Sequence, residues 1–148
     1  MQLTLIIRKS GRSVADPIKT TKSFRHKDIE LKDIIFIDKL SDIDYGMIKS
    51  DWWIVLYDDE HIEPRLLDAV VAASDWGKFD VFSFYKMDAD ARVFICPRMF
   101  RKGIKTDTER LYPSTVVPME CLLDGWVLDH DCHACEPETT EDVPVQTG

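Results

Sequence analysis

The sequence has no apolar run long enough to cross a membrane and contains only six glycines. A spanning helix needs roughly 20 consecutive apolar residues, so no spanning segment is expected. Neither a P-loop nor a glycine-rich dinucleotide-binding turn is present, and phosphate binding by a glycine-rich backbone loop is therefore not favoured. No segment is typical of the nucleophile elbow of a Ser or Cys enzyme.

Basic residues are missing from one end of the chain, because residues 111–148 contain eight Asp or Glu and no Lys or Arg. This segment accounts for the net charge of -8. Proteins that bind nucleic acid over a broad surface usually carry a basic excess, so nucleic acid is not expected as a partner. The N-terminal segment has its apolar residues before its charges, the reverse of a secretory signal, which predicts a cytoplasmic location.

A chain of 148 residues suits one domain with one hydrophobic core. We expect residues 1–133 to form this compact domain. Residues 134–148 are acidic and rich in Pro and Thr, and we expect them to form a flexible tail because they have little apolar surface to bury. The four cysteines are expected to be reduced thiols, since a chain with a full core does not need disulfides.

Apolar runs alternate with helical patterns along the first half of the chain. This order is typical of an α/β unit in which parallel strands are joined by right-handed helical crossovers. We therefore predict an α/β fold, a single-domain three-layer sandwich. The expected strands cover residues 3–7, 33–37, 52–57, 80–87 and 91–99, and the expected helices cover residues 14–24 and 65–74.

The most informative stretch is DWWIVLYDDE, residues 51–60. Trp52 to Tyr57 is an unbroken apolar and aromatic run, typical of a strand buried on both faces. Three carboxylates follow at once, and Pro64 then stands where a helix begins. Ligands of open α/β sheets collect outside the carboxyl ends of the strands, so these acidic residues lie where chemistry is expected.

This stretch resembles GT-A type glycosyltransferases of family 2, especially the small bacterial ones that build lipopolysaccharide cores. Their signature is a strand ending in a phrase like WILFLDADE, followed by a proline-started helix. Asp59 and Glu60 match the last Asp and Glu of that phrase, while Tyr57 replaces its first Asp and Asp58 replaces a small residue. A second phrase, PRMFRKG at residues 97–103, is similar to the family's PRLFRRG.

The resemblance implies a reduced GT-A (nucleotide-diphospho-sugar transferase-like) fold, because the chain between Asp38 and Asp51 is shorter than in the family. It also implies a divalent metal, Mn or Mg, that neutralises a leaving diphosphate. The implied metal ligands are Asp58, Asp59 and His130. The implied catalytic base is Glu120, and the implied substrate-binding residues are Asp38, Arg98, Arg101 and Lys102.

The expected function is transfer of a sugar from a nucleotide-diphosphate donor to a hydroxyl acceptor, such as a glycan. One alternative is a non-catalytic binding or regulatory protein on a degenerate transferase scaffold, because Tyr57 replaces a carboxylate. Another is a viral sugar transferase that acts on modified DNA bases. The cluster HDCHAC at residues 130–135 also offers ligands for zinc, although four ligands within six residues close a tetrahedron poorly.

Overall fold

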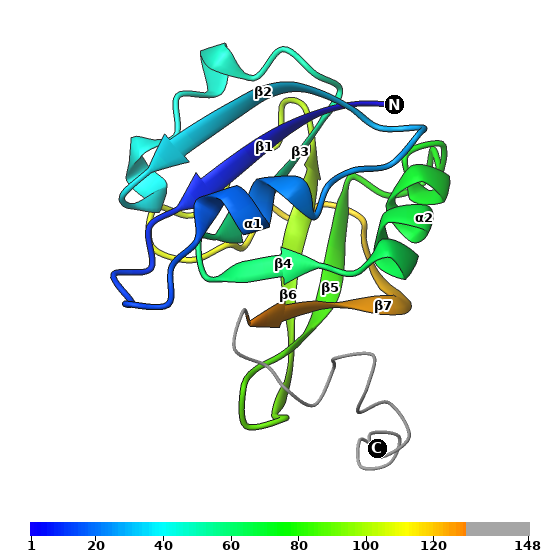
Figure 1. Ribbon diagram of the computed structural model, residues 1–148. Coiled ribbons are helices and arrows are strands. Elements are labelled where there is room, and N and C mark those ends of the chain that lie inside the picture. Colours follow the sequence, from blue (N-terminus) through cyan, green and yellow to red (C-terminus); the bar gives the residue numbers. More distant parts are fainter. Residues whose placement is uncertain (130–148) are drawn as a thin grey trace.

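The computed structural model describes residues 1–129, which form a curled mixed sheet with strand order β2-β1-β3-β6-β5-β7-β4 (Figure 1). The strands are β1 (Gln2–Arg8), β2 (Glu30–Ile37), β3 (Trp52–Tyr57), β4 (Glu60–Ile62), β5 (Val81–Met87), β6 (Val93–Arg101) and β7 (Met119–Asp129). The strand predicted over residues 52–57 is confirmed to the residue, because its apolar run is buried from Trp52 to Leu56.

Strand β1 lies between β2 and β3 and pairs with both in parallel, as the predicted crossovers require. Strand β6 then pairs antiparallel with β3 and with β5, so the second half of the sheet is mixed. Strand β7 runs parallel to β5, and the short strand β4 pairs antiparallel with the end of β7. The parallel part of the sheet was therefore predictable, whereas the β7 and β4 strands were not predicted.

Two short α-helices accompany these strands. Helix α1 (Pro17–Lys22) has six residues, and its first turn is capped by the Asp16 side chain, which accepts a hydrogen bond from the Lys19 backbone N–H. Helix α2 (Pro64–Ala73) begins at Pro64 as predicted and buries one apolar face. The buried residues of this face are Leu66, Leu67, Val70 and Ala73.

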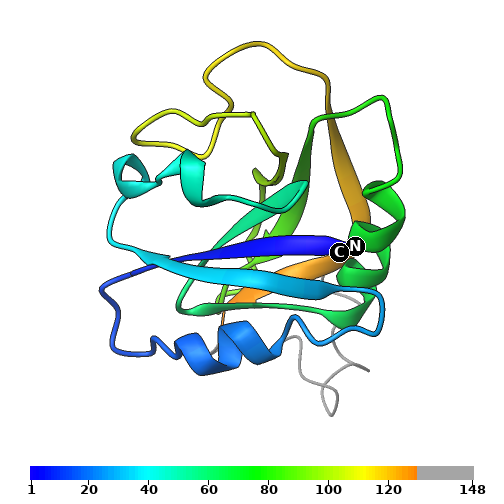
Figure 2. The same ribbon diagram turned by 90° about the horizontal axis from the view of Figure 1, so that it is seen from above.

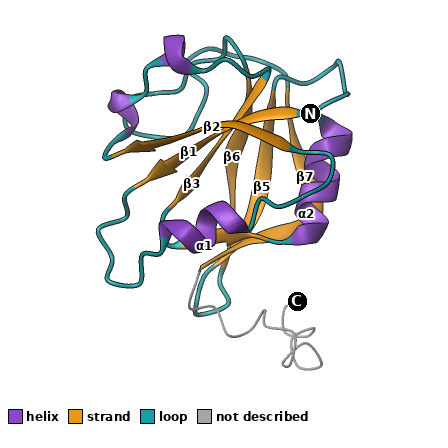
Figure 3. Ribbon diagram, turned by 45° about the horizontal axis from the view of Figure 1, so that its top comes forward, coloured by secondary structure: helices purple, strands orange, loops and turns teal. Residues whose placement is uncertain are grey.

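The prediction of a three-layer α/β sandwich is wrong, because helices cover one face of the sheet only. The opposite face is covered by two 3-10 turns, η1 (Leu40–Asp42) and η2 (Tyr45–Met47), and by the loop of residues 102–118. Figure 2 shows α1 and this loop on opposite sides of the sheet, and Figure 3 shows how little of the chain is helical. The protein is mostly β because only two of the connections between strands contain an α-helix.

The two faces of the sheet carry two hydrophobic clusters. Alternate residues of β3 divide between them, with Trp52, Ile54 and Leu56 on the α2 face and Trp53 and Val55 on the loop face. This division follows from the strand period of two residues, which points successive side chains to opposite faces. Residues in β3 are therefore buried on both sides even though only one side has helices.

The acidic residues after β3 were expected to lie in a loop that leads into a helix, but they do not. Asp58 and Asp59 form a turn, and Glu60 begins strand β4, which crosses to pair with the end of β7. Glu60 lies directly opposite Asp129 in this pairing. The curl of the sheet thus brings the carboxyl end of β3 next to the carboxyl end of β7.

No helix among the described residues is long and apolar enough to span a membrane. The cytoplasmic location stays a prediction. The described residues all fall within the predicted compact domain of residues 1–133, and the predicted tail of residues 134–148 lies outside them.

Gly125 in β7 is a position where a side chain cannot fit. Its φ is +101°, and an added Cβ would lie 2.4 Å from the Leu66 backbone nitrogen at the start of α2. We predict that Gly125→Ala lowers the free energy of unfolding by about 3 kcal/mol or more, because backbone strain and displacement of α2 add. Urea unfolding followed by tryptophan fluorescence measures this change.

Gly103 supplies the matched control, because its φ is +99° but an added Cβ meets no atom within 4 Å. We expect Gly103→Ala to lose only the strain contribution, about 1–2 kcal/mol. Equal losses in the two variants would contradict the close packing of β7 on α2.

Candidate functional site

Asp58 anchors the β1–α1 loop to the end of β3. Its Oδ1 accepts a hydrogen bond from the Ser10 backbone N–H at 2.9 Å. Its own backbone N–H donates to the Arg8 carbonyl, and its carbonyl accepts from the Asp16 backbone N–H at 2.7 Å. Asp58 therefore holds the backbone of the β1–α1 loop in place, and one of its carboxylate oxygens already accepts a hydrogen bond.

Asp59 forms a close ion pair with Arg12, whose Nη1 donates to Oδ2 at 2.7 Å. Its side chain is only 4% exposed, and Oδ1 has no hydrogen-bond partner among the described residues. Burial and the nearby charge of Glu60 raise the pKa of Asp59, while Arg12 and Lys86 act in the opposite direction. Asp59, which the resemblance implies as a metal ligand, is thus a carboxylate that forms an ion pair with an arginine.

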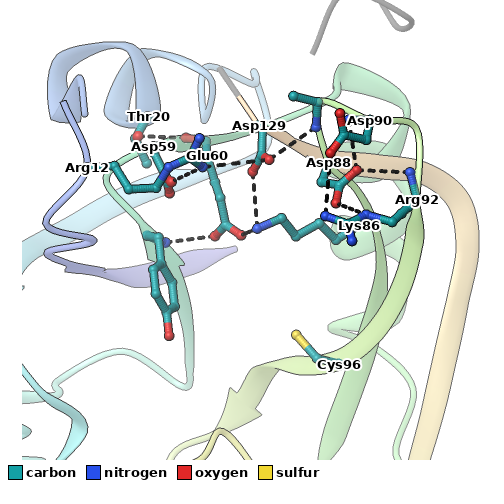
Figure 4. Close-up of polar contacts among 12 residues, drawn as sticks. Arg12, Thr20, Asp59, Glu60, Lys86, Asp88, Asp90, Arg92, Cys96 and Asp129 are labelled. Carbon is teal, nitrogen blue, oxygen red and sulfur yellow. Dashed lines mark hydrogen bonds and ion pairs between the residues drawn. The ribbon is translucent and has the colours of Figure 1, made fainter. Parts of the chain in front are cut away.

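Glu60 is fully buried and is bound by two cations. Its two carboxylate oxygens accept hydrogen bonds from Nη1 and Nη2 of Arg98, each at 2.7 Å. Lys86 Nζ lies 2.6 Å from Oε2 (Figure 4), and the Tyr57 backbone N–H donates to Oε1. Burial alone would raise the pKa of Glu60, but the charges and hydrogen bonds of Arg98 and Lys86 lower it to about 2.

Lys86 and Asp129 complete this cluster, and the sequence analysis missed both. Lys86 Nζ lies 3.1 Å from Asp129 Oδ1. The two groups form an ion pair, but the geometry does not meet the criteria for a hydrogen bond. Burial would lower the pKa of Lys86, but the charge of Glu60 raises it. A weak signal for both was present in the sequence, because Lys86 is the charged residue within the run VFSFYKM and Asp129 directly follows the apolar run WVL.

A pocket of about 470 Å³ lies beside Glu60, between the loop face of the sheet and the loop of residues 102–118. This volume is within the range of small-molecule sites. Four of its residues are cationic and three are aromatic. The lining residues are Arg8, Tyr57, Glu60, Lys86, Phe94, Cys96, Arg98, Glu109, Arg110, Leu111 and Tyr112.

Tyr57 forms part of the pocket wall between two guanidinium groups. The Cζ atoms of Arg8 and Arg98 lie 5.2 and 5.8 Å from its ring centroid, within range of cation–π contacts. Arg8 Nη1 also donates to the Tyr57 hydroxyl at 2.9 Å. The position at which the resemblance implies a carboxylate is therefore occupied by a phenol that arginines surround.

Arg8 and Arg110 differ from the other two cations of the pocket, because neither has a carboxylate partner within residues 1–129. Arg110 instead lies with its Cζ 5.7 Å from the Tyr112 ring centroid. Glu109 is likewise without an ion-pair partner in the described part of the chain. Within the described part of the chain, the pocket thus combines two positive charges and one carboxylate that have no ion-pair partner.

Three other predicted site residues lie outside this pocket. Asp38 is exposed, pairs with Lys9 at 3.3 Å, and lines a separate cavity of about 420 Å³. Arg101 pairs with Asp80 at 2.8 Å and covers the Trp52 ring with its guanidinium. Glu120 lies on β7 in a cavity of about 380 Å³ beside α2, where its Oε1 accepts from the Cys121 backbone N–H.

Of the remaining predicted residues, Arg98 lines the pocket, whereas Lys102 is exposed and does not. The Lys102 backbone N–H donates to the Asp51 carbonyl at 2.7 Å. His130 and the HDCHAC segment lie outside the described residues. Among the predicted residues that the structure describes, Arg98 alone lines the pocket. Asp58 and Asp59 form the turn that precedes Glu60, whereas Asp38, Arg101, Lys102 and Glu120 lie elsewhere.

The described residues do not fit the implied divalent metal. Within residues 1–129 there is no group of three or more His, Cys, Asp or Glu arranged to hold a metal ion. Asp59 and Glu60 face Arg12, Arg98 and Lys86, and a dication beside them would meet three positive charges.

A scan of protein-family models found no match to this chain, and a search of curated proteins found no significant match either. The resemblance to glycosyltransferases therefore stays a hypothesis that rests on the two sequence phrases.

The first prediction from this site concerns the buried pair of Glu60 and Arg98. Arg98→Met leaves a buried carboxylate without its bidentate partner, so we expect the free energy of unfolding to fall by about 3–5 kcal/mol. Lys9→Met is the matched control, because Lys9 and Asp38 are both about 70% exposed and such pairs contribute little. Urea unfolding of both variants measures the contrast, and equal effects would contradict the role of burial.

The second prediction concerns acid unfolding. The folded-state pKa of Glu60 is about 2, against 4.5 for an ordinary Glu. Its stabilisation is therefore complete above about pH 4.5 and is lost as the pH falls to about 2, a change of about 3 kcal/mol. The difference in unfolding free energy between the wild type and Glu60→Gln should shrink by this amount across that window. A difference that stays constant with pH would refute the assignment.

Proposed function

We propose that this protein transfers a sugar from a nucleotide-diphosphate donor to a hydroxyl acceptor, with the donor bound in the pocket beside Glu60. The observation that carries the proposal is a pocket at the carboxyl end of β3 that combines aromatic side chains with two arginines that have no carboxylate partner among the described residues. Tyr57 ends this strand, and Arg8 ends the neighbouring strand β1. The two sequence phrases that resemble glycosyltransferases flank the same place, since Arg98 belongs to the second of them.

The charge of the pocket supports an anionic ligand. Glu60 is neutralised by Arg98 and Lys86, so these three residues together carry a single positive charge, which Asp129 offsets. Of the other charged residues of the pocket, Arg8 and Arg110 are positive and Glu109 is negative, so a net positive charge remains for a ligand. Guanidinium groups bind phosphate oxygens in pairs of parallel hydrogen bonds, so a diphosphate matches this arrangement.

The aromatic residues of the pocket support a ligand with flat or apolar faces. Tyr57, Phe94 and Tyr112 all line it, and Phe94 and Tyr112 are each about half exposed. Rings of this kind stack on the faces of sugars and nucleotide bases. A ligand with both a diphosphate and a sugar or base would use the arginines and the rings together.

The reaction needs a group that accepts the proton of the acceptor hydroxyl. The hydroxyl oxygen forms a bond to the anomeric carbon of the donor sugar. The bond from that carbon to the diphosphate breaks, and its electron pair leaves on the diphosphate. Within the pocket wall, Glu109 is the carboxylate without an ion-pair partner among the described residues, so we assign the proton to it.

A non-catalytic binding protein that uses the same pocket is the second candidate. The observation in its favour is that Glu60, the most buried carboxylate of the pocket, is fully paired and has its pKa lowered to about 2. Such a group is a poor proton acceptor. Transfer to modified DNA bases is less well supported, because the chain carries a net charge of -8.

We predict that Glu109→Gln lowers kcat for sugar transfer about 100-fold or more and leaves KM nearly unchanged, because the variant binds the donor but cannot accept the proton. The assay measures release of nucleoside diphosphate from a panel of nucleotide sugars, with and without added hydroxyl acceptors. Glu120→Gln is the control, since Glu120 lies in a different cavity and should retain activity. Donor binding without turnover under all conditions would favour the binding protein.

A further inference from the structure

We propose that the pocket neutralises the diphosphate of its ligand with Arg8 and Arg110 and needs no divalent metal. This inference rests on the proposed function, since it concerns how the same ligand is held. It is carried by the partners of each charged side chain at the carboxyl end of β3.

Each carboxylate that a metal would need has at least one oxygen bound by a protein group, while Asp59 Oδ1 has no hydrogen-bond partner within residues 1–129. Asp58 Oδ1 accepts from the Ser10 backbone N–H, and Asp59 Oδ2 is held by Arg12 at 2.7 Å. Glu60 has both oxygens on Arg98 and one of them on Lys86. A dication at this place would have to displace these cations and would lose their ion pairs.

The contact between Tyr57 and Arg8 also supports a site without a metal. Its hydroxyl accepts a hydrogen bond from Arg8 Nη1, which fixes the Arg8 guanidinium at the pocket wall. This single contact uses one of the five N–H groups that an arginine carries. Arg8 is therefore positioned by a neutral group, and within residues 1–129 no carboxylate pairs with it.

Arg110 approaches the pocket from a different element, a loop that its own backbone closes. The Ser114 backbone N–H donates to the Lys105 carbonyl, and the Asp107 backbone N–H donates to the Tyr112 carbonyl, both at 2.8 Å. The Tyr45 hydroxyl accepts from the Thr106 backbone N–H at 2.9 Å and joins the loop to η2.

Arg110 thus lies within a loop that backbone hydrogen bonds close, and Arg8 is the last residue of strand β1. Both line one pocket. Two guanidinium groups from separate walls can contact the two phosphates of one diphosphate, and their charge replaces that of a dication.

The experiment is isothermal titration of the full chain with uridine, guanosine, adenosine and cytidine diphosphates and with inorganic pyrophosphate. Each titration is made in EDTA and in excess Mn²⁺. We expect at least one of these probes to bind in EDTA, and Mn²⁺ not to tighten its binding. Arg8→Gln and Arg110→Gln should each weaken that binding roughly 10- to 100-fold.

Arg92→Gln is the control with the same change of charge, because Arg92 is 68% exposed, pairs with Asp88 and Asp90, and lies outside the pocket. It should bind like the wild type. Thermal melting of each variant tests whether the fold is kept. If Arg8→Gln unfolds, the binding of Arg110→Gln, whose substitution lies on an exposed loop, decides the test.

The outcomes separate this inference from the proposed function. Binding that requires Mn²⁺ and is lost in Asp59→Asn would overturn the arginine clamp and leave the transferase proposal standing. Metal-independent binding that neither arginine variant weakens would also overturn the clamp alone. Failure of every probe to bind, with and without Mn²⁺, would overturn the proposed function itself.

Discussion

The ion pair between Glu60 and Arg98 is the interaction on which the rest of the structure depends. A carboxylate with no exposure to water requires hydrogen bonds and opposite charge in place, because an isolated buried charge is strongly unfavourable. Glu60 belongs to β4, Arg98 to β6 and Lys86 to β5. One carboxylate therefore ties β4 to the consecutive strands β5 and β6, which lie further along the sequence and pair with each other, and the curl of the sheet is the geometry in which all three side chains meet.

The same residues that hold the sheet also form one wall of the pocket. A change at Glu60 or Arg98 therefore alters both the stability of the fold and the shape and charge of the pocket. Arg8, Glu109 and Arg110 are different, because they line the pocket without an ion-pair partner among residues 1–129. Among the described residues, those that stabilise the fold at the pocket are thus distinct from those whose charges have no ion-pair partner.

The local pattern of the sequence predicted the parallel core of the fold. The run from Trp52 to Tyr57 and the proline at residue 64 fixed the limits of β3 and the start of α2 because burial and helix initiation depend on neighbouring residues. The mixed half of the sheet depends on pairings with distant partners, such as Glu60 with Asp129, and no local pattern specifies these. The three-layer prediction failed because it assumed parallel strands with helices on both faces, whereas the second half of the sheet is mixed.

The candidate site was predictable in place but not in chemistry. The acidic residues after the buried strand lie next to the candidate pocket, but an acidic motif does not reveal which cations will face it. Leaving-group charge can be neutralised by a metal that carboxylates hold or by cationic side chains. The two arrangements exclude each other within one small volume, because carboxylates that pair with arginines and lysine no longer carry the net negative charge that attracts a dication. Among the described residues, Arg12, Lys86 and Arg98 pair with Asp59, Asp129 and Glu60, while Asp58 beside them has its Oδ1 bound by the Ser10 backbone N–H. This near balance of charge favours the second arrangement.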